Sequence, residues 1–483
     1  MNKTSPHPEW ATKFRKPGTE LRLIRNKYYL YAVSSVYDPI TKKGKKRTGK
    51  IMGSITQANG FVESAVRVLN KKAQSPIDFS SIAIKEYGFS GFINVYFKEQ
   101  LDKLKSFFAE DWQQIVAITY CRMVFHSPIK NMPLHLGKSM LTNTLEYSFT
   151  DKKISSLLHS IGQKRETVVG FMKSFIDPGD YLLTDLTNIF NASNKISIAK
   201  EGYNRHMVFD KQINLLYIYS PTLALPVFYR LFAGNLREVK GIRLTLKESG
   251  IQDAIMIADK GFYSAANITF LQEQNLKYII PLRRDNALIK YELMSKTSSN
   301  YFKFDDRYIW YANYELQEQQ IFLFLDEKLM IQEEKDFLNR VENKLEGYRI
   351  ENFLAKNNKF GTMAIITNDL EKNASRIYNS YKSRNEIEVM FDGMKNVLDA
   401  DKTYMQNEET LQGWMFINHL ALQWYYIIYK MLKEHELLGK YSVNDMIIHL
   451  KEVRKVRING NWVLEPITNQ TQKLLSKLQV AIT

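Results

Sequence analysis

The segment YKSRNEIEVMFDGMK, Tyr381–Lys395, holds the pattern on which the interpretation of the whole chain depends. Tyr381, Arg384, Glu388 and Lys395 lie in it at offsets of 0, 3, 7 and 14. At about 100° per residue of α-helix, these four side chains fall within one stripe about 60° wide. The spacing therefore predicts a helix that presents a carboxylate beside a phenol, a guanidinium and an ammonium.

The opposite side of this helix, which we expect to run over residues 374–398, is apolar and suited to packing on a sheet. A carboxylate is a ligand for a hard cation, whereas a guanidinium and an ammonium bind phosphate. The stripe therefore fits a metal ligand beside a phosphodiester backbone. The alternative is an exposed helix face with ion pairs between residues four apart, which is how many such charge patterns arise.

Two neighbouring acids have to be weighed against Glu388. Asp392 also falls on the stripe, about 20° from Tyr381, and is a rival for the same role. Glu386 lies at about 140° and is not.

Two acidic residues in apolar segments with strand character are possible partners for Glu388. Asp185 lies within YLLTDLT, and Asp259 ends the run AIMIAD before Lys260-Gly261. Acids are disfavoured in apolar strands, so each calls for a reason. A strand-terminal Asp that accepts hydrogen bonds from a turn is the alternative for either. Asp180 and Asp253, in turn-like surroundings, are weaker candidates.

The order of predicted elements indicates a multidomain α/β protein. Three strands, a helix and a further strand between residues 181 and 259 follow the order of a ribonuclease H-like (RNase H-like) core, an order that many α/β folds share. We expect four regions: a basic β-hairpin module at 1–60, a mainly helical region at 61–176, the core at 177–400 with a β-rich insertion at about 265–370, and a helical region at 401–483.

Composition narrows the class of protein. The chain has 483 residues, 45% of them hydrophobic, which excludes disorder as a description of the whole. Its one cysteine, Cys121, excludes an internal disulfide and cysteine-based metal clusters. Neither a signal sequence, a run of 18 apolar residues, a metal-binding histidine motif nor a Walker A motif occurs. We therefore expect a protein of a reducing compartment that needs no membrane and no nucleotide cofactor.

The positive charge is concentrated near the N-terminus. The chain has a net charge of +16, and residues 1–50 carry 13 basic residues against three acidic ones, a net +10. A polyanion is the natural partner of such a cluster, because neutralised phosphates release counterions. A solvated hairpin tip that binds nothing is the alternative. The densest run is KKGKKR, with Lys42, Lys43, Lys45, Lys46 and Arg47.

These motifs together resemble the bacterial insertion-sequence DDE transposases of the YREK-signature branch. The spacing of Tyr381, Arg384, Glu388 and Lys395 matches the signature, and Asp259-Lys260-Gly261-Phe262 looks like the motif of the second acid. Asp185 looks like the first acid, and Gly234-Asn235 resembles a loop common between the two. The resemblance covers roughly residues 20–470 and implies the same fold, an RNase H-like core with a β-rich insertion.

The resemblance implies a catalytic and metal-binding triad of Asp185, Asp259 and Glu388 with two Mg²⁺ ions, for which Mn²⁺ can substitute. Tyr381, Arg384 and Lys395 would then bind DNA phosphates. The aromatic candidate for holding a flipped base in the insertion is Trp310, in YIWYANY, although a hairpin tryptophan more often packs against its neighbours. Double-stranded DNA, a homodimer on that DNA and a bacterial cytoplasmic, nucleoid-associated location are also implied.

Three functions fit these features. The first is a cut-and-paste transposase that binds terminal inverted repeats, cleaves DNA and transfers strands. The second is a transposase-derived DNA-binding regulator without catalysis, and the third is a metal-dependent DNA nuclease that lacks strand transfer. The presence of all three acids favours an enzyme.

Overall fold

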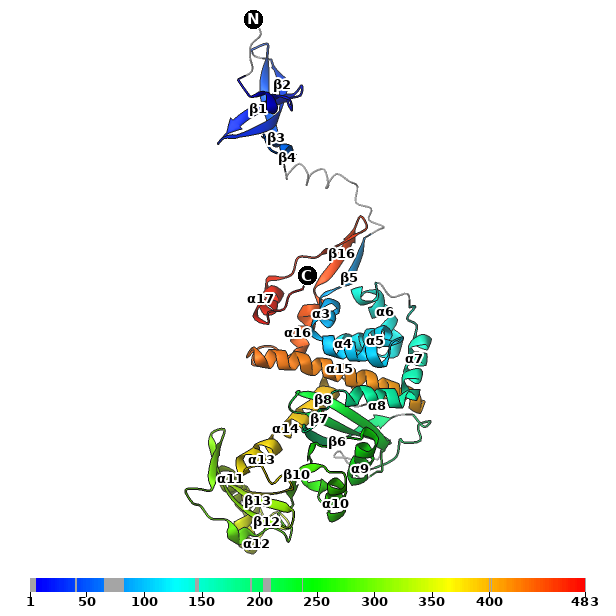
Figure 1. Cartoon of the computed structure of the whole chain (residues 1–483), viewed down its shortest axis with the longest axis vertical. Coiled ribbons are helices and arrows are strands. Elements are labelled where there is room, and N and C mark those ends of the chain that lie inside the picture. The colour runs from blue at the N-terminus through cyan, green and yellow to red at the C-terminus, as the bar shows by residue number, and fades with distance from the viewer. Residues whose placement is uncertain are drawn as a thin grey trace. The chain divides into compact units, whose positions relative to one another are not determined.

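A computed structural model of the chain describes residues 6–39, 41–64, 82–143, 147–191, 193–202, 210–236, 238–398, 400 and 402–482. The chain divides into two compact units, which are described separately (Figure 1). The smaller unit comprises Met1–Ala83 with Arg457–Val463, and the larger comprises Ile84–Val456 with Leu464–Thr483. The region boundaries expected at residues 60, 176 and 400 stay predictions.

An antiparallel four-stranded sheet of order β1-β2-β3-β4 forms the body of the smaller unit. Its strands follow the short helix α1 (Glu9–Thr12) and are β1 (Thr19–Ile24), β2 (Lys27–Asp38), β3 (Lys43–Thr56) and β4 (Gly60–Glu63). Leu21, Leu30 and Ile55 are its buried core. Arg25 and Asn26 both adopt positive φ, which closes the tight turn between β1 and β2.

The basic run lies in a different place from the one expected. We predicted KKGKKR at a hairpin tip, but β3 already begins at Lys43. Its first residues pair with β2 in register, from Asp38 opposite Lys43 to Ser34 opposite Arg47. Only Lys42, with a φ of 49°, remains in the turn. The basic side chains therefore stand on a two-stranded ribbon.

The larger unit is built on a sheet whose central part has the order β8-β7-β6-β9-β10. β6, β7 and β8 pair antiparallel, whereas β9 is parallel to both β6 and β10. Three antiparallel strands followed by two parallel ones fit an RNase H-like core, as the sequence predicted. The elements are β6 (Tyr181–Asn191), β7 (Gln212–Ser220), β8 (Leu225–Ala233), α9 (Glu238–Ser249), β9 (Ile255–Ile257), α10 (Ala265–Glu273) and β10 (Lys277–Leu282).

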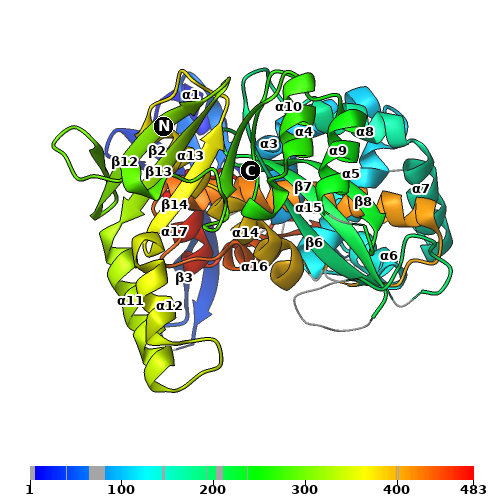
Figure 2. The same ribbon diagram turned by 90° about the horizontal axis from the view of Figure 1, so that it is seen from below.

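The insertion extends the same sheet. β14 pairs antiparallel with β10, and the order continues through β13 and β12 to β11. Two helices, seen beside these strands in Figure 2, connect β13 to β14. The elements are β11 (Tyr301–Phe304), β12 (Arg307–Leu316), β13 (Gln319–Asp326), α11 (Glu327–Glu342), α12 (Ile350–Lys356) and β14 (Thr362–Thr367).

The prediction of one continuous helix over residues 374–398 is wrong. α13 (Ala374–Lys382) ends before Ser383, and α14 (Asn385–Asp392) begins after Arg384. A π-helical turn over Gly393–Val397 then widens the spiral. Because a π turn holds more residues than an α turn, the angular position assumed for Lys395 from a regular α-helix does not apply.

Helices preceding and following the core pack on β8. The 27-residue α15 (Glu408–Glu434) contacts α5, α7 and β8 (Figure 1). The other elements of this layer are α3 (Gly88–Tyr96), α4 (Lys98–Phe107), α5 (Trp112–Phe125), α6 (Met132–Gly137), α7 (Asp151–Gln163) and α8 (Arg165–Lys173). The remaining elements are β5 (Ala83–Glu86), β15 (Lys402–Thr403), α16 (Val443–Lys451), β16 (Arg454–Ile458), β17 (Asn461–Leu464) and α17 (Asn469–Lys477).

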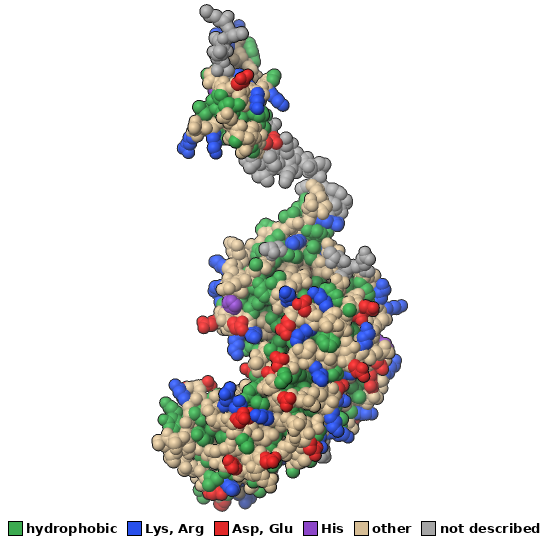
Figure 3. Space-filling view, viewed as in Figure 1, with side chains coloured by type: hydrophobic (Ala, Val, Ile, Leu, Met, Phe, Trp, Pro, Cys, Tyr) green, Lys and Arg blue, Asp and Glu red, His purple; other side chains and the backbone are tan. Residues whose placement is uncertain are grey.

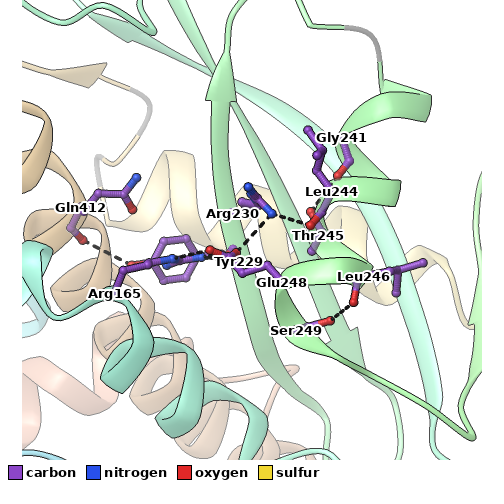
Figure 4. A network of polar contacts seen from close by, with 10 residues as sticks. All are labelled: Arg165, Tyr229, Arg230, Gly241, Leu244, Thr245, Leu246, Glu248, Ser249 and Gln412. Atoms are coloured by element: carbon purple, nitrogen blue, oxygen red, sulfur yellow. Dashed lines mark hydrogen bonds and ion pairs between the residues drawn. The ribbon is translucent and has the colours of Figure 1, made fainter.

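A polar network fastens this layer to the sheet (Figure 4). Arg165 of α8 donates Nε and Nη2 to the two carboxylate oxygens of Glu248 in α9, at 3.0 and 2.8 Å. Its Nη2 also donates to the carbonyl oxygen of Tyr229 in β8, at 3.1 Å, and the Tyr229 hydroxyl donates to the carbonyl of Gln412 in α15, at 3.3 Å. A forked guanidinium on a carboxylate is a strong, geometrically specific pair, so the sheet and three helices are held in a defined register.

No helix in the described part of the chain is both long and apolar enough to cross a membrane.

Close packing of α7 and α15 depends on glycines. A Cβ atom at Gly413 would overlap the carbonyl oxygen of Leu158, and one at Gly162 would overlap that of Glu409. We expect Gly413→Ala to lower the free energy of unfolding by about 1–3 kcal/mol, because separating two backbones costs more than the gain in helix propensity. Urea denaturation measures this. Gly439, where a Cβ meets nothing within 4 Å, is the matched control, and equal stability of the two variants would contradict the packing.

Candidate active site

Two carboxylates follow a paired position of the adjacent parallel strands β6 and β9, one within its strand and one just beyond it. Leu183 of β6 is paired with Ile257 of β9. Asp185 comes two residues later in β6, on the same face as Leu183, because side chains alternate with a period of two. Asp259 comes two residues after Ile257, the last residue of β9. Both aspartates are half-buried. The strand register is compatible with the expectation that Asp185 and Asp259 share one site, which stays a prediction.

Arg384 brings the third acid to this place. The residue lies between α13 and α14, and α14 packs on β6. Its Nη2 donates to Asp185 Oδ2 at 2.9 Å, and its Nη1 donates to Glu388 Oε1 at 3.1 Å. The Asp185 and Arg384 side chains are 14% and 11% exposed, and that of Glu388 is 57% exposed. One guanidinium therefore bridges a strand acid and a helix acid.

Tyr381 and Asp259 belong to the same electrostatic cluster. Burial raises the pKa of the Tyr381 phenol; the charge of Arg384 opposes this, and the carboxylates of Asp259, Glu388 and Asp185 add to it. Burial lowers the pKa of Arg384, but the neighbouring charges raise it above its usual value. These charges are, largest first, those of Asp185, Asp259, Tyr381 and Glu388. Five of the predicted site residues thus interact around one guanidinium: Tyr381, Arg384, Asp185, Asp259 and Glu388.

The donor set suits a divalent cation in chemistry, since three carboxylates are the hard oxygen ligands that Mg²⁺ and Mn²⁺ prefer. Within the described residues, however, no three acidic, histidine or cysteine side chains are grouped closely enough to share one ion. The guanidinium of Arg384 stands between the acids instead. Arg384 thus supplies the positive charge that this acidic site requires.

The rival acids lie in other surroundings. Burial raises the pKa of the Tyr425 phenol in α15, and the charge of Asp392 raises it further. Asp180 accepts a hydrogen bond from the Ser220 hydroxyl at 3.3 Å, and Asp253 has a left-handed backbone with a φ of 54°. The geometry favours Glu388 over Asp392.

The other predicted site residues are placed as follows. Lys395 lies in the π-helical turn after α14, and Trp310 lies on β12 of the insertion. The indole Nε1 of Trp310 donates to Glu327 Oε2 at 3.1 Å, and its ring is tilted against Tyr301 at 5.3 Å between centroids. The basic run from Lys42 to Arg47 belongs to the smaller unit, where Figure 3 shows Lys and Arg side chains projecting.

Sequence reasoning missed a second feature of α14. Glu386, which it placed off the stripe, lines a cavity of about 490 Å³ with Tyr219 of β7 and Tyr426 of α15. Burial raises the pKa of Glu386, and the charge of Lys433 opposes this. No spacing in the sequence signals this cavity, because its walls come from segments far apart in the chain.

An RNase H-like sheet carries acids on β6, after β9 and on the helix packed against β6. The model of the transposase DDE domain family matches residues 185–424, a range that contains all three acids. The match supports a DDE transposase.

Other comparisons add little. No curated protein matches the chain. A cryo-EM structure of a piggyBac transposase synaptic complex with hairpin DNA is 11% identical, with a TM-score of 0.38 over 76% of this chain and 79% of that chain. A pre-cleavage Mos1 transpososome is 11% identical, with a TM-score of 0.16 over 32% and 54% of the two chains. Similarities of this size support no argument about this chain.

The bridge predicts unequal roles for the two strand acids in the metal-free protein. We expect Asp185→Asn to lower the free energy of unfolding by about 1–3 kcal/mol, because it removes the charged partner of a buried guanidinium. Asp259→Asn should cost less than about 1 kcal/mol, since it weakens only a longer-range attraction. Urea denaturation with a chelator present compares them. A more stable Asp185→Asn protein would show that repulsion between the acids dominates.

Proposed function

We propose that the chain is a cut-and-paste DNA transposase that binds the terminal inverted repeats of an insertion sequence, cleaves DNA there and transfers the strands. The observation that carries this proposal is the position of Asp185 on β6 and of Asp259 just after the paired strand β9, with Glu388 joined to Asp185 through Arg384. The match to the transposase DDE domain over residues 185–424 supports it.

In this proposal Asp185, Asp259 and Glu388 hold two divalent cations, Mg²⁺ or Mn²⁺ in its place. When bound, such a pair activates the attacking oxygen and stabilises the leaving oxygen of an in-line phosphodiester displacement. The neighbouring cationic and phenolic groups, Arg384, Lys395 and Tyr381, bind the phosphates on either side of the reacting bond. A forked guanidinium suits this task because it donates two parallel hydrogen bonds to phosphate oxygens.

The ribbon of β2 and β3 is the proposed DNA-binding surface outside the active site. Lys43, Lys45 and Arg47 alternate onto one face, opposite Asp38, Val36 and Ser34 of β2. Lys46 points to the other face, where its Nζ contacts Glu20 Oε1 at 2.7 Å. A two-stranded ribbon fits the major groove of B-DNA, so the face with Lys43, Lys45 and Arg47 is the better candidate for phosphate contacts.

Trp310 is the proposed platform for a flipped base in the insertion. Its ring contacts that of Tyr301, which in turn contacts that of Tyr308. These two tyrosines are 46% and 57% exposed. Stacking of a base on such a ring is worth about 1–3 kcal/mol. The hydrogen bond from the indole to Glu327 fixes the edge of the ring.

The working form that we propose is a homodimer on double-stranded DNA, because pairing two transposon ends requires two active sites. Its location would be the bacterial cytoplasm, in association with the nucleoid, with neither a nucleotide cofactor nor a membrane involved. A DNA-binding regulator without catalysis and a nuclease without strand transfer are the competing functions.

The three acids should be indispensable for catalysis and dispensable for binding. We expect Asp185→Asn, Asp259→Asn and Glu388→Gln each to lower strand transfer of pre-cleaved ends by at least about 10³-fold in Mg²⁺, since each removes a ligand charge. Asp392→Asn, on the same helix, is the control and should retain activity. Cleavage without joining by the wild type would support the nuclease, and DNA binding without either reaction would support the regulator.

The two faces of the ribbon should differ in their contribution to DNA binding. Replacing both Lys45 and Arg47 by Ala should reduce the slope of log K against log salt by up to about 2, because each lost phosphate contact contributes about 1. Lys46→Ala should leave the slope nearly unchanged, since Glu20 already neutralises this lysine. Fluorescence anisotropy over a salt series measures both. Equal losses would place DNA on both faces.

Trp310→Ala should lower excision of the element from a donor plasmid by about 10-fold or more, since a lost stacking contact costs about 1–3 kcal/mol. Trp310→Phe, which keeps an aromatic face, should retain part of the activity. Unchanged excision by Trp310→Ala would show that the indole only packs against its neighbours.

A further inference from the structure

Both oxygens of Asp185 are already engaged in this structure. Oδ1 accepts a hydrogen bond from the backbone N–H of Leu186 at 2.9 Å, and Oδ2 accepts one from Arg384 Nη2 at 2.9 Å. A cation bound at Asp185 through Oδ2 would have to share or replace the contact with Arg384. Since like charges repel strongly in a partly buried site, replacement costs less than sharing.

The same guanidinium also occupies the helix acid. Nη1 of Arg384 donates to Glu388 Oε1 at 3.1 Å, so a single side chain takes one oxygen from each of two proposed cation ligands. Arg384 is 11% exposed, and a guanidinium stays protonated in proteins. The arginine is therefore a permanent positive charge held inside the acidic site.

One donor of Arg384 is left over. Its Nε is buried and has no hydrogen-bond acceptor among the described residues. A buried donor without a partner costs about 1–3 kcal/mol. The side chain is therefore incompletely satisfied on the two carboxylates, whereas a phosphate offers enough oxygens to accept from the whole fork.

We propose that Arg384 is an internal counter-ion that keeps the acidic site closed to divalent cations until DNA is bound. In the DNA-free protein the guanidinium neutralises Asp185 and Glu388. A backbone phosphate of bound DNA takes the guanidinium away and frees the oxygens for cations. DNA binding and cation binding then strengthen one another by the same factor, as linkage requires. The inference rests on the proposed function, because it assumes that these acids hold the cations.

This arrangement would restrain the enzyme when no DNA is present. An acidic cluster that loads cations by itself is ready to activate water against any phosphodiester. With Arg384 in place, the loaded site forms mainly where a phosphate backbone already lies against α14.

The test measures Mn²⁺ binding to the full chain without DNA, by electron paramagnetic resonance of the free ion. We expect Arg384→Gln to bind Mn²⁺ more tightly than the wild type, by a factor on the order of 10, within the usual range for coupled sites. Arg384→Lys, which keeps the charge but lacks the fork, should fall between them. Arg376→Gln is the matched control, because Arg376 is exposed on the preceding helix α13 and carries the same charge.

A second arm adds a short double-stranded DNA oligonucleotide. The Mn²⁺ affinity of the wild type should rise by a similar factor on DNA, whereas that of Arg384→Gln should change much less, because its site is already open. Adding Asp185→Asn to either background should remove the bound Mn²⁺, which identifies the site that is measured. Circular dichroism confirms that each variant is folded, and the comparison with and without DNA is made within one variant.

The outcomes separate this inference from the proposed function. If the wild type binds Mn²⁺ at Asp185 equally well with and without DNA, and Arg384→Gln binds it no better, the counter-ion role is wrong while the cation site stands. If Arg384→Gln binds Mn²⁺ more weakly, Arg384 holds the ligands in place instead of competing with the cation. If no form binds Mn²⁺ even on DNA, both the inference and the proposed function fail.

Discussion

The contact of Arg384 with Asp185 is the interaction on which the candidate site depends. It joins residues 199 positions apart, and it ties the junction of α13 and α14 to the central strand β6. Asp259 follows the end of β9, which pairs with β6, and its charge acts on Arg384. The helical step from Arg384 to Glu388 adds the third acid. A buried carboxylate is costly unless it is neutralised, and in this structure the guanidinium of Arg384 neutralises Asp185.

Much of the core could be predicted from the sequence because local patterns determine it. The apolar runs around Asp185 and Asp259 become β6 and the end of β9, in the predicted order of strands. The four-residue spacing from Arg384 to Glu388 survives, since both side chains still meet across one helical turn. Where the local pattern and the tertiary packing agree, the residue types alone are sufficient to predict the element.

The failures arise where longer-range packing overrides a local pattern. The break at Ser383 and the π turn over Gly393–Val397 interrupt a helix that the periodicity predicts as continuous. Gly393 lies close to the ring of Tyr425 on α15. Because α15 is a separate segment of the chain, the periodicity of residues 374–398 holds no information about this contact. The basic run was expected at a tip, but pairing with β2 draws it into a strand. The bridge from Arg384 to Asp185 was missed for the same reason, because no spacing encodes it.

The central claim is that Asp185, Asp259 and Glu388 form one cation site on DNA. The most direct measurement is an experimental structure of the chain with bound DNA and Mn²⁺, in which anomalous scattering locates the ions. The account predicts manganese between the three carboxylates, with Arg384 moved onto a phosphate. Carboxylates that stay more than about 8–10 Å apart, too far to share two ions at the usual separation of about 3.5–4 Å, or manganese bound only at other residues, would contradict it.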